Sequence, residues 1–312
     1  MKIIFCGAPR FASIVLEKLA KSQFSPILVI TRPDEPVGRK QVLTPPAAKF
    51  TALAEKIKVF QPEDTNELEK KLKQIKPDMA IVAAYGRLIP KEILGIPKYG
   101  FINVHPSLLP KWRGASPIQY TVLNGDKETG VTIMQMDEII DHGFILSQKK
   151  IKIDPQKINS QELTEKLAVI GADLLMETIN NLFSAKANPV AQKDKNATYS
   201  KILTKQDGRI DWRNSAEKIE RQIRAFNPWP GTFTFDGNNN LVKIFKASVQ
   251  RQTGNCPVGK LGKTFLATND QIAVQCQKDF LIIEELQLGG GKRMKTEDFL
   301  RGHQQFVGTI LK

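Results

Sequence analysis

An asparagine and a histidine two positions apart, Asn103 and His105, are the residues of this chain best suited to do chemistry. They follow the β-like run 99–102 and precede Pro106. Side chains alternate along a strand, so these two point to the same face, and the proline ends regular pairing just after them. An amide can donate to a developing oxyanion, and an imidazole can also carry a proton. The pair therefore predicts a reaction at a carbonyl group, at the end of a strand.

A third catalytic group is expected from an acidic cluster farther along the chain. Asp137, Glu138 and Asp141 follow the strand-like run 130–136 and precede Gly143. A carboxylate beside the imidazole would hold its ring in one orientation and favour the protonated form. A solvated turn would have the same composition, and the residues alone leave the choice among the three carboxylates open.

The elements that must position these groups alternate between strand and helix. Strands are expected at residues 2–6, 26–31, 58–60, 79–85, 101–104, 130–136 and 144–153. Helices are expected at residues 11–21, 47–57, 66–75, 116–123 and 160–182. Alternation of this kind, with continuously apolar strands, predicts an α/β fold with a doubly wound, mostly parallel sheet. Such sheets bind ligands beyond the carboxyl ends of their strands, where Asn103 and His105 are expected.

The remainder of the chain has a different pattern. Residues 189–208 are polar and aperiodic, which is typical of a linker. A helix is then expected at 215–225, with five short strands at 231–235, 241–247, 259–267, 272–275 and 280–288. Short strands separated by turn signals predict a small antiparallel, OB-like β-barrel. We therefore predict a catalytic domain at 1–188, a linker at 189–208 and a barrel domain at 209–312.

The charge of the chain favours a polyanionic partner. The 312 residues include 46 Lys and Arg against 32 Asp and Glu, a net charge of +14. An excess of this size is typical of proteins that contact nucleic acid, although it also aids solubility. Two places could meet phosphates: the loop 32–46, which contains Arg39, and a group of cations and aromatics near the barrel. That group is Arg221, Arg224, Phe226, Trp229, Lys243 and Lys246.

Cysteine and histidine usage restricts the other classes. Cys6, Cys256 and Cys276 are few, odd in number and far apart, as expected of reduced thiols in a cytoplasm. The three histidines pair with no cysteine at zinc-like spacing, so we expect no metal. No apolar run approaches the roughly 20 residues that a membrane-spanning helix needs.

Several stretches resemble the folate-dependent formyltransferases. In the first part they are residues 5–9 (FCGAP), 84–86 (AYG), 102–110 (INVHPSLLP), 112–115 (WRGA) and 130–136 (GVTIMQM). In the second part, residues 210–212 (IDW), 224–231 (RAFNPWPG) and 242–247 (VKIFKA) are similar to the branch of that family that acts on methionyl-tRNA. Together these stretches extend over nearly the whole chain.

The resemblance implies an activity and a set of site residues. The activity is transfer of the formyl group of 10-formyltetrahydrofolate to the amino group of initiator methionyl-tRNA, for translation initiation, by a monomeric cytoplasmic enzyme. The catalytic trio of the family matches Asn103, His105 and Asp141. Its folate-contacting segment matches Ser107, Leu108, Leu109 and Pro110, and its tRNA-contacting loop matches the segment around Arg39. Its small β-barrel domain, which contacts tRNA, matches the basic second part of the chain.

Two departures and three alternatives accompany this reading. Where many members have Asp-Thr-Gly-Pro, this chain has Asp141-His142-Gly143-Phe144, and Lys40 follows Arg39 where a glycine is familiar. One alternative is a formyltransferase for a small-molecule amine of the nucleotide-sugar type. A formyltetrahydrofolate hydrolase and a non-catalytic RNA-binding protein on the same scaffold are the others.

Overall fold

The structure, a computed structural model, describes residues 1–38, 40–252, 259–267 and 271–312. It divides into two units. Unit 1 is Met1–Ile118, Glu128–Ile153 and Glu162–Lys201, and unit 2 is Gln119–Lys127, Asp154–Gln161 and Ile202–Lys312. The expected limits of the catalytic domain, linker and barrel domain stay a prediction. Arg39 and Cys256 lie outside the described residues.

Unit 1 is built on a seven-stranded sheet with the order β10-β9-β7-β6-β1-β2-β5. These strands are β1 (Ile3–Gly7), β2 (Leu28–Ile30), β5 (Lys58–Phe60), β6 (Met79–Ala83), β7 (Phe101–His105), β9 (Glu128–Gln135) and β10 (Ile145–Lys152). The strands from β5 to β7 run parallel, whereas β9 is antiparallel to β7 and β10 to β9. Every residue of β1, β2, β6 and β7 is buried, because continuously apolar strands need cover on both faces. The mostly parallel α/β sheet is confirmed.

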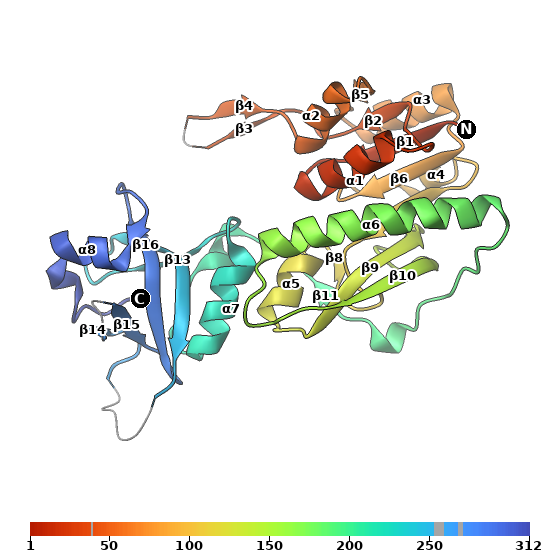
Figure 1. The fold of residues 1–312 in the computed structure, drawn as a ribbon. Coiled ribbons are helices and arrows are strands. Elements are labelled where there is room, and N and C mark those ends of the chain that lie inside the picture. The colour runs from red at the N-terminus through yellow and green to blue at the C-terminus, as the bar shows by residue number, and fades with distance from the viewer. Residues whose placement is uncertain (39, 253–258, 268–270) are drawn as a thin grey trace. The chain divides into compact units, whose positions relative to one another are not determined.

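Helices cover the sheet of unit 1 (Figure 1). They are α1 (Arg10–Ala20), α2 (Ala47–Ala54), α3 (Thr65–Ile75), α4 (Lys91–Leu94) and the greater part of α6 (Ser160–Phe183). Helix α5 (Pro117–Leu123) begins in unit 1, and its residues from 119 onward belong to unit 2. A Cβ at Gly171 of α6 would lie 2.8 Å from Val104 Cγ1. This close approach seats α6 directly on β7, the strand that carries Asn103 and His105.

The expected loop at 32–46 contains a hairpin. Its strands β3 (Glu35–Val37) and β4 (Val42–Thr44) pair antiparallel, and the hairpin extends away from the rest of unit 1 (Figure 1). Its base is held by Lys49, whose Nζ lies 2.8 Å from both carboxylate oxygens of Asp34. The side chains of Val42 and Leu43 are 58% and 64% exposed, so these two residues of β4 do not pack into the core of unit 1.

Residues 190–200, within the expected linker, belong to unit 1 and pack against its other segments. The segment contains the 3₁₀ turn η1 (Asp194–Asn196) and β11 (Tyr199–Ser200), which pairs in parallel with β8 (Arg113–Gly114). At its start, Val190 and Ile145 exchange two backbone hydrogen bonds of 2.9 Å. Because these contacts are made by backbone and short side chains, they leave no periodic pattern in the sequence. We call residues 190–200 the back strap.

Unit 2 contains an antiparallel sheet with the order β12-β13-β16-β15-β14, and β17 pairs with β16. Its elements are η2 (Lys205–Gly208), α7 (Ala216–Phe226), β12 (Thr232–Phe235), β13 (Leu241–Gln250), β14 (Thr264–Leu266), β15 (Ile272–Gln275), β16 (Phe280–Leu288), β17 (Met294–Lys295), α8 (Thr296–Gly302) and η3 (Gln304–Phe306). The C-terminal segment joins the two edge strands: Lys312 N donates to Phe235 O, and Thr264 N donates to Thr309 O, both at 2.8 Å. The expected small barrel is therefore an antiparallel sheet that closes through this segment.

For Phe226 and Arg224, the prediction of a phosphate-binding role is wrong. Phe226 is 3% exposed, so its ring is not free to stack on a base. Arg224 bonds Glu220 in its own helix and donates to the carbonyl oxygen of Ile158 at 2.6 Å, so its guanidinium is used within the fold. Trp229, at 57% exposure, and Lys243 stay at the surface. In the last turn of α7, the spacing of apolar residues in the sequence did not show which side chains are buried and which are exposed.

Candidate active site

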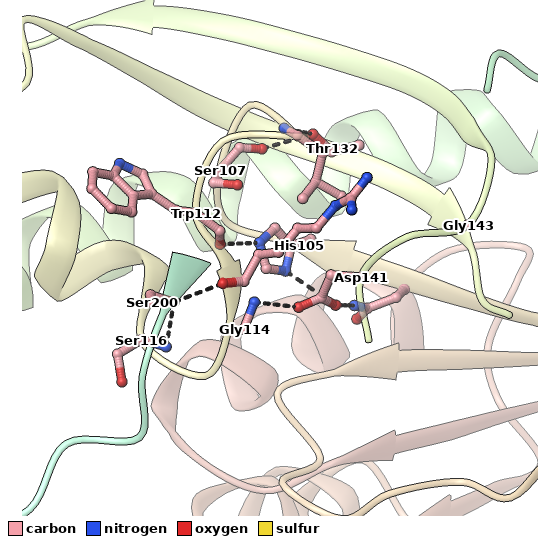
Figure 2. Close-up of polar contacts among 12 residues, drawn as sticks. His105, Ser107, Trp112, Gly114, Ser116, Thr132, Asp141, Gly143 and Ser200 are labelled. Atoms are coloured by element: carbon pink, nitrogen blue, oxygen red, sulfur yellow. Dashed lines mark hydrogen bonds and ion pairs between the residues drawn. The ribbon is translucent and has the colours of Figure 1, made fainter. Parts of the chain in front are cut away.

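Three side chains from two segments meet at the carboxyl end of β7. Asn103 and His105 are 9% and 4% exposed, and both face Asp141. Asn103 Nδ2 donates to Asp141 Oδ1 at 3.4 Å, and His105 Nδ1 lies 3.6 Å from the same oxygen. Figure 2 shows His105 and Asp141 pointing toward one another. The structure thus brings together the three residues that the sequence analysis placed in one catalytic trio.

The geometry distinguishes Asp141 from the other two acids of its loop. Glu138 forms an exposed ion pair with Lys91 at 2.7 Å, and Asp137 Oδ2 lies 2.7 Å from His142 Nδ1. Asp141 adopts a left-handed φ of 51°, which turns its carboxylate toward β7. This conformation is uncommon for residues other than glycine, because the Cβ crowds the backbone. The choice left open by composition is therefore decided by the path of the loop backbone.

Both nitrogens of the His105 ring face oxygen atoms. Nε2 lies 3.1 Å from the carbonyl oxygen of Trp112, and Nδ1 faces the carboxylate of Asp141 (Figure 2). A carbonyl oxygen only accepts, so Nε2 carries a proton and donates it to this bond. A ring protonated on both nitrogens would satisfy both oxygens. The imidazole and the carboxylate thus form a pair that can stabilise negative charge and exchange a proton.

Asp141 is itself fixed by the segment that follows the Trp112 carbonyl. Gly114 N donates to Asp141 Oδ2 at 2.8 Å. Gly114 has φ 106°, and a Cβ there would lie 2.3 Å from the carbonyl oxygen of Ser200. Only glycine fits this position, since both the backbone conformation and the neighbouring strand exclude a side chain. Trp112 is 9% exposed, and its carbonyl oxygen contributes to the site.

The segment after His105 forms a turn that two polar side chains hold, the buried Thr132 and the more exposed Gln148. Thr132 Oγ1 accepts from Leu109 N at 3.1 Å and donates to Ser107 O at 2.7 Å. Gln148 Nε2 donates to Leu109 O at 2.8 Å and to Thr132 Oγ1 at 2.9 Å. Ser107 and Leu109 are 0% and 3% exposed, so their side chains stabilise the turn. Leu108 and Pro110 are half-buried and can face a ligand.

Comparison with known proteins identifies the family. A formyl transferase family model matches residues 1–179, and a model of the formyl transferase C-terminal domain matches residues 202–304. The chain belongs to the formyltransferase family. This formyltransferase is 42% identical over 316 residues to the methionyl-tRNA formyltransferase of Caldanaerobacter subterraneus subsp. tengcongensis, with 100% of both chains covered. It is 40% identical to that of Bacillus subtilis, over 99% of this chain and 97% of the relative.

Solved structures agree with the fold of this formyltransferase. WlaRD, a sugar 3N-formyl transferase in the presence of dTDP and 5-N-formyl-THF, superposes with a TM-score of 0.64 at 22% identity, over 92% of this chain and 97% of that one. HypX from Aquifex aeolicus in complex with tetrahydrofolic acid superposes with a TM-score of 0.63 at 16% identity, over 98% and 47%. At these identities the likeness concerns the fold alone.

Several residues of the formyltransferase site were not singled out from the sequence. Thr132 and Gln148 hold the 107–110 turn, and Gln192 in the back strap bonds the Asp141 loop. Thr132 sits opposite His105 in the antiparallel pair of β7 and β9, so strand register could have indicated it. Nothing in the polar, aperiodic sequence around Gln192 pointed to its partners.

The two cysteines in the described part of the formyltransferase are structural. Burial raises the pKa of Cys6 and of Cys276 to about 12, so both stay neutral thiols. Within the described residues, no group of three or more His, Cys, Asp and Glu side chains is arranged to hold a metal ion. None of the helices in the described part of the chain combines the length and the apolar sequence that a bilayer span requires.

Proposed function

We propose that this formyltransferase transfers the formyl group of 10-formyltetrahydrofolate to the α-amino group of initiator methionyl-tRNA. The observation that carries the proposal is the 42% identity over the full length of a methionyl-tRNA formyltransferase, through unit 2 as well as unit 1. The basic charge of +14 supports a nucleic-acid acceptor. A sugar-type acceptor has weaker support, since the sugar formyltransferase WlaRD shares only 22% identity.

The catalytic trio would stabilise negative charge on the formyl oxygen and handle the proton that leaves the attacking amine. One N–H of Asn103 bonds Asp141, and its second N–H is a donor for the oxygen that gains negative charge. The imidazolium form of His105 adds positive charge beside that oxygen. Asp141 keeps the ring oriented through the contact at 3.6 Å and is itself held by Gly114 N. A proton must leave the attacking amine, and His105 and Asp141 are the groups placed to handle it.

The site also fits a folate. When bound, the folate supplies the formyl group on a nitrogen that leaves once it is protonated. Leu108 and Pro110 are the half-buried members of the 107–110 turn. Ile139 and Ile140, directly before Asp141, are 56% and 58% exposed. Exposed apolar side chains beside a catalytic carboxylate are unusual unless a flat apolar group covers them. We propose these four residues as the folate-contacting surface.

A transfer assay tests the proposed function. Purified protein, 10-formyltetrahydrofolate and charged initiator methionyl-tRNA should give formylmethionyl-tRNA, whereas uncharged tRNA should accept nothing. An amino sugar nucleotide is the competing acceptor. Transfer to the sugar nucleotide alone would reassign the enzyme to the small-molecule branch. Release of formate with every acceptor would indicate a hydrolase.

Binding of tRNA should weaken steeply as salt is added. Lysines and arginines that neutralise phosphates release condensed counterions, so log K should fall linearly with log salt, with a slope of about −0.7 to −0.9 per phosphate contact. Filter binding or fluorescence anisotropy between 50 and 200 mM salt, roughly the range over which such proteins lose most affinity, measures it. An affinity that does not change with salt would contradict a polyanionic acceptor.

Lys243 should contribute to this salt dependence. It is exposed on β13, and Trp229 is also exposed within unit 2. Lys243→Met should reduce the slope of log K against log salt by roughly one and raise KM for tRNA. KM for the formyl donor serves as the internal control and should not change. An unaltered slope would remove Lys243 from the tRNA-binding surface.

Three finer expectations are also proposals. Arg39, which lies between the β3 and β4 segments in the sequence, is proposed to contact the tRNA, and Arg39→Ala should raise KM for tRNA without changing kcat. We propose a monomer, which light scattering of the purified protein would test. A cytoplasmic location accords with few, widely spaced cysteines.

A further inference from the structure

A single amide in the back strap joins the two segments that hold the catalytic side chains. Gln192 Nε2 donates to the carbonyl oxygens of Asp141 and Gly143, both at 2.9 Å. Its Oε1 accepts from Arg113 Nε at 3.0 Å and from Arg113 Nη2 at 2.8 Å. The amide is therefore saturated, with two donors facing the Asp141 loop and its acceptor facing Arg113.

Arg113 stands between the two backbone groups that orient the trio. The preceding residue, Trp112, supplies the carbonyl beside His105, and the following residue, Gly114, supplies the N–H to Asp141. The Arg113 side chain is 3% exposed, and its Nη2 also bonds Asp194 at 2.8 Å. The guanidinium beside Asp194 holds the pKa of that carboxyl below its ordinary value. Arg113 is thus a buried, doubly bonded side chain that holds the Gln192 amide oxygen in place.

The loop on the other side needs such a support. Asp141 is in the left-handed region at φ 51°, a conformation that costs a non-glycine residue about 1 kcal/mol or more. Gly143 passes so close to β9 that a Cβ there would lie 1.9 Å from Gln135 O. Gln192 bonds the carbonyls on both sides of His142 and so keeps this turn from relaxing.

We propose that Gln192 is a positioning residue for Asp141. By holding the backbone on both sides of His142, it keeps the carboxylate on His105 and Asn103. Asp194 of the back strap also reaches this loop, with its Oδ2 3.6 Å from His142 Nε2, but that contact ends on a half-buried side chain and not on the backbone carbonyls that Gln192 holds. Thr198 Oγ1 accepts from Trp112 N at 2.9 Å, in the segment that follows His105 in the sequence. The inference rests on the proposed function, because its effect is measured on formyl transfer.

Two substitutions separate this role from simple packing. Gln192→Met keeps the length of the side chain and removes every hydrogen bond. Gln192→Glu keeps an acceptor for Arg113 and makes it negatively charged. It also removes both donors, so that a carboxylate oxygen faces the two backbone carbonyl oxygens and repels them. If Gln192 acts on Asp141, both variants should lower kcat by about 10- to 100-fold, as misplacement of a catalytic group does. KM for tRNA and for the formyl donor should stay within about twofold, because neither ligand loses a contact.

A matched control exists in unit 2. Gln222 Nε2 donates to the carbonyl oxygens of Asp207 and Arg209, at 2.9 and 3.2 Å, which is the same two-carbonyl bridge made entirely among residues of unit 2. Gln222→Met should lower the thermal midpoint as Gln192→Met does and leave kcat near the parental value. A Gln192→Glu enzyme with parental kcat would overturn the proposal, since it would assign Gln192 only to the support of Arg113.

A double-mutant cycle gives the deciding readout. Once Asp141 is replaced by asparagine, a residue that works only through its carboxylate has nothing left to position. Gln192→Met should therefore lower kcat no further in the Asp141→Asn background, and the pH profile of Gln192→Met should move toward that of Asp141→Asn. Multiplied losses would overturn the proposal. If Gln192→Met fails to fold, Gln192→Asn, whose shorter amide cannot reach both carbonyls, takes its place in the cycle.

The parental enzyme separates failure of the inference from failure of the proposed function. A parental protein that transfers no formyl group to methionyl-tRNA would refute the function itself. A parental protein that transfers it, with Gln192 variants that match it in kcat, would refute only the positioning role.

Discussion

Asp141→Asn should lower kcat on the order of 1,000- to 10,000-fold while the protein stays folded. Asparagine has the shape of aspartate, and its oxygen can still accept from Gly114 N. The change replaces one acceptor by an N–H₂ donor and removes the charge, so both Asn103 Nδ2 and His105 Nδ1 lose the oxygen that they share. Without it, the His105 ring loses the carboxylate that orients it. Single-turnover formyl transfer to methionyl-tRNA would measure the loss directly.

Glu138→Gln is the matched control, because Glu138 is an acid of the same loop whose partner is the exposed Lys91. It should change kcat by less than about twofold, since exposed ion pairs contribute little. Equal activities of Asp141→Asn and Glu138→Gln, with intact thermal unfolding, would show that the carboxylate near His105 has no part in the reaction.

Only part of the trio could be predicted from the residues and their spacing alone. Asn103 and His105 could be placed together because a strand fixes the relation between residues two apart. Asp141 could not be separated from Asp137 and Glu138 in this way. Its orientation depends on one left-handed backbone residue, and no periodicity encodes the path of an irregular loop. The family resemblance selected Asp141, and the contact of 3.6 Å provides the physical reason.

The supports of the site were hidden for a different reason. Gln192 and Arg113 are separated by 79 positions, and their meeting depends on the back strap pairing with β8. A polar, aperiodic segment has the composition of a linker whether or not its backbone is bonded to the rest of the fold. Thr132 and Gln148 likewise act through single hydrogen bonds to a turn. Contacts of this kind become visible only when strand register is known.

The fold itself followed the hydrophobic pattern closely where elements were long and buried. The strands of the parallel sheet and helices α1, α3, α6 and α7 lie where apolar periodicity put them. The β3–β4 hairpin was missed because its described side chains are mostly exposed, and α8 was missed because its seven residues are too few to show a helical period. The sequence pattern also did not predict that the last residues close the unit 2 sheet, because a segment of irregular backbone that hydrogen-bonds to strands has no alternating apolar pattern of its own.

Asn103→Ala should lower kcat by about 100- to 1,000-fold, the usual loss when one donor to an oxyanion is removed. Asn103 is 9% exposed and its side chain bonds only Asp141 in the described structure, so the truncation removes one long hydrogen bond of 3.4 Å from the fold. Stability should therefore fall by roughly 1 kcal/mol, whereas the transition state loses a donor that nothing replaces. KM for the formyl donor should change little if the bond strengthens only as charge develops.

Asn103→Asp sharpens the same test. The substituted side chain keeps the size of asparagine but sets a second carboxylate within reach of Asp141 Oδ1, and it offers an acceptor where the oxyanion needs a donor. It should be at least as inactive as Asn103→Ala at neutral pH, and it should recover part of its activity as the pH falls and the extra carboxyl is protonated. Measurement of kcat for both variants from pH 5.5 to 8.5, roughly the range over which a carboxyl beside another carboxylate loses its proton, distinguishes the cases. An Asn103→Asp enzyme more active than Asn103→Ala at every pH would mean that this position accepts a proton during the reaction, and that the oxyanion is stabilised elsewhere.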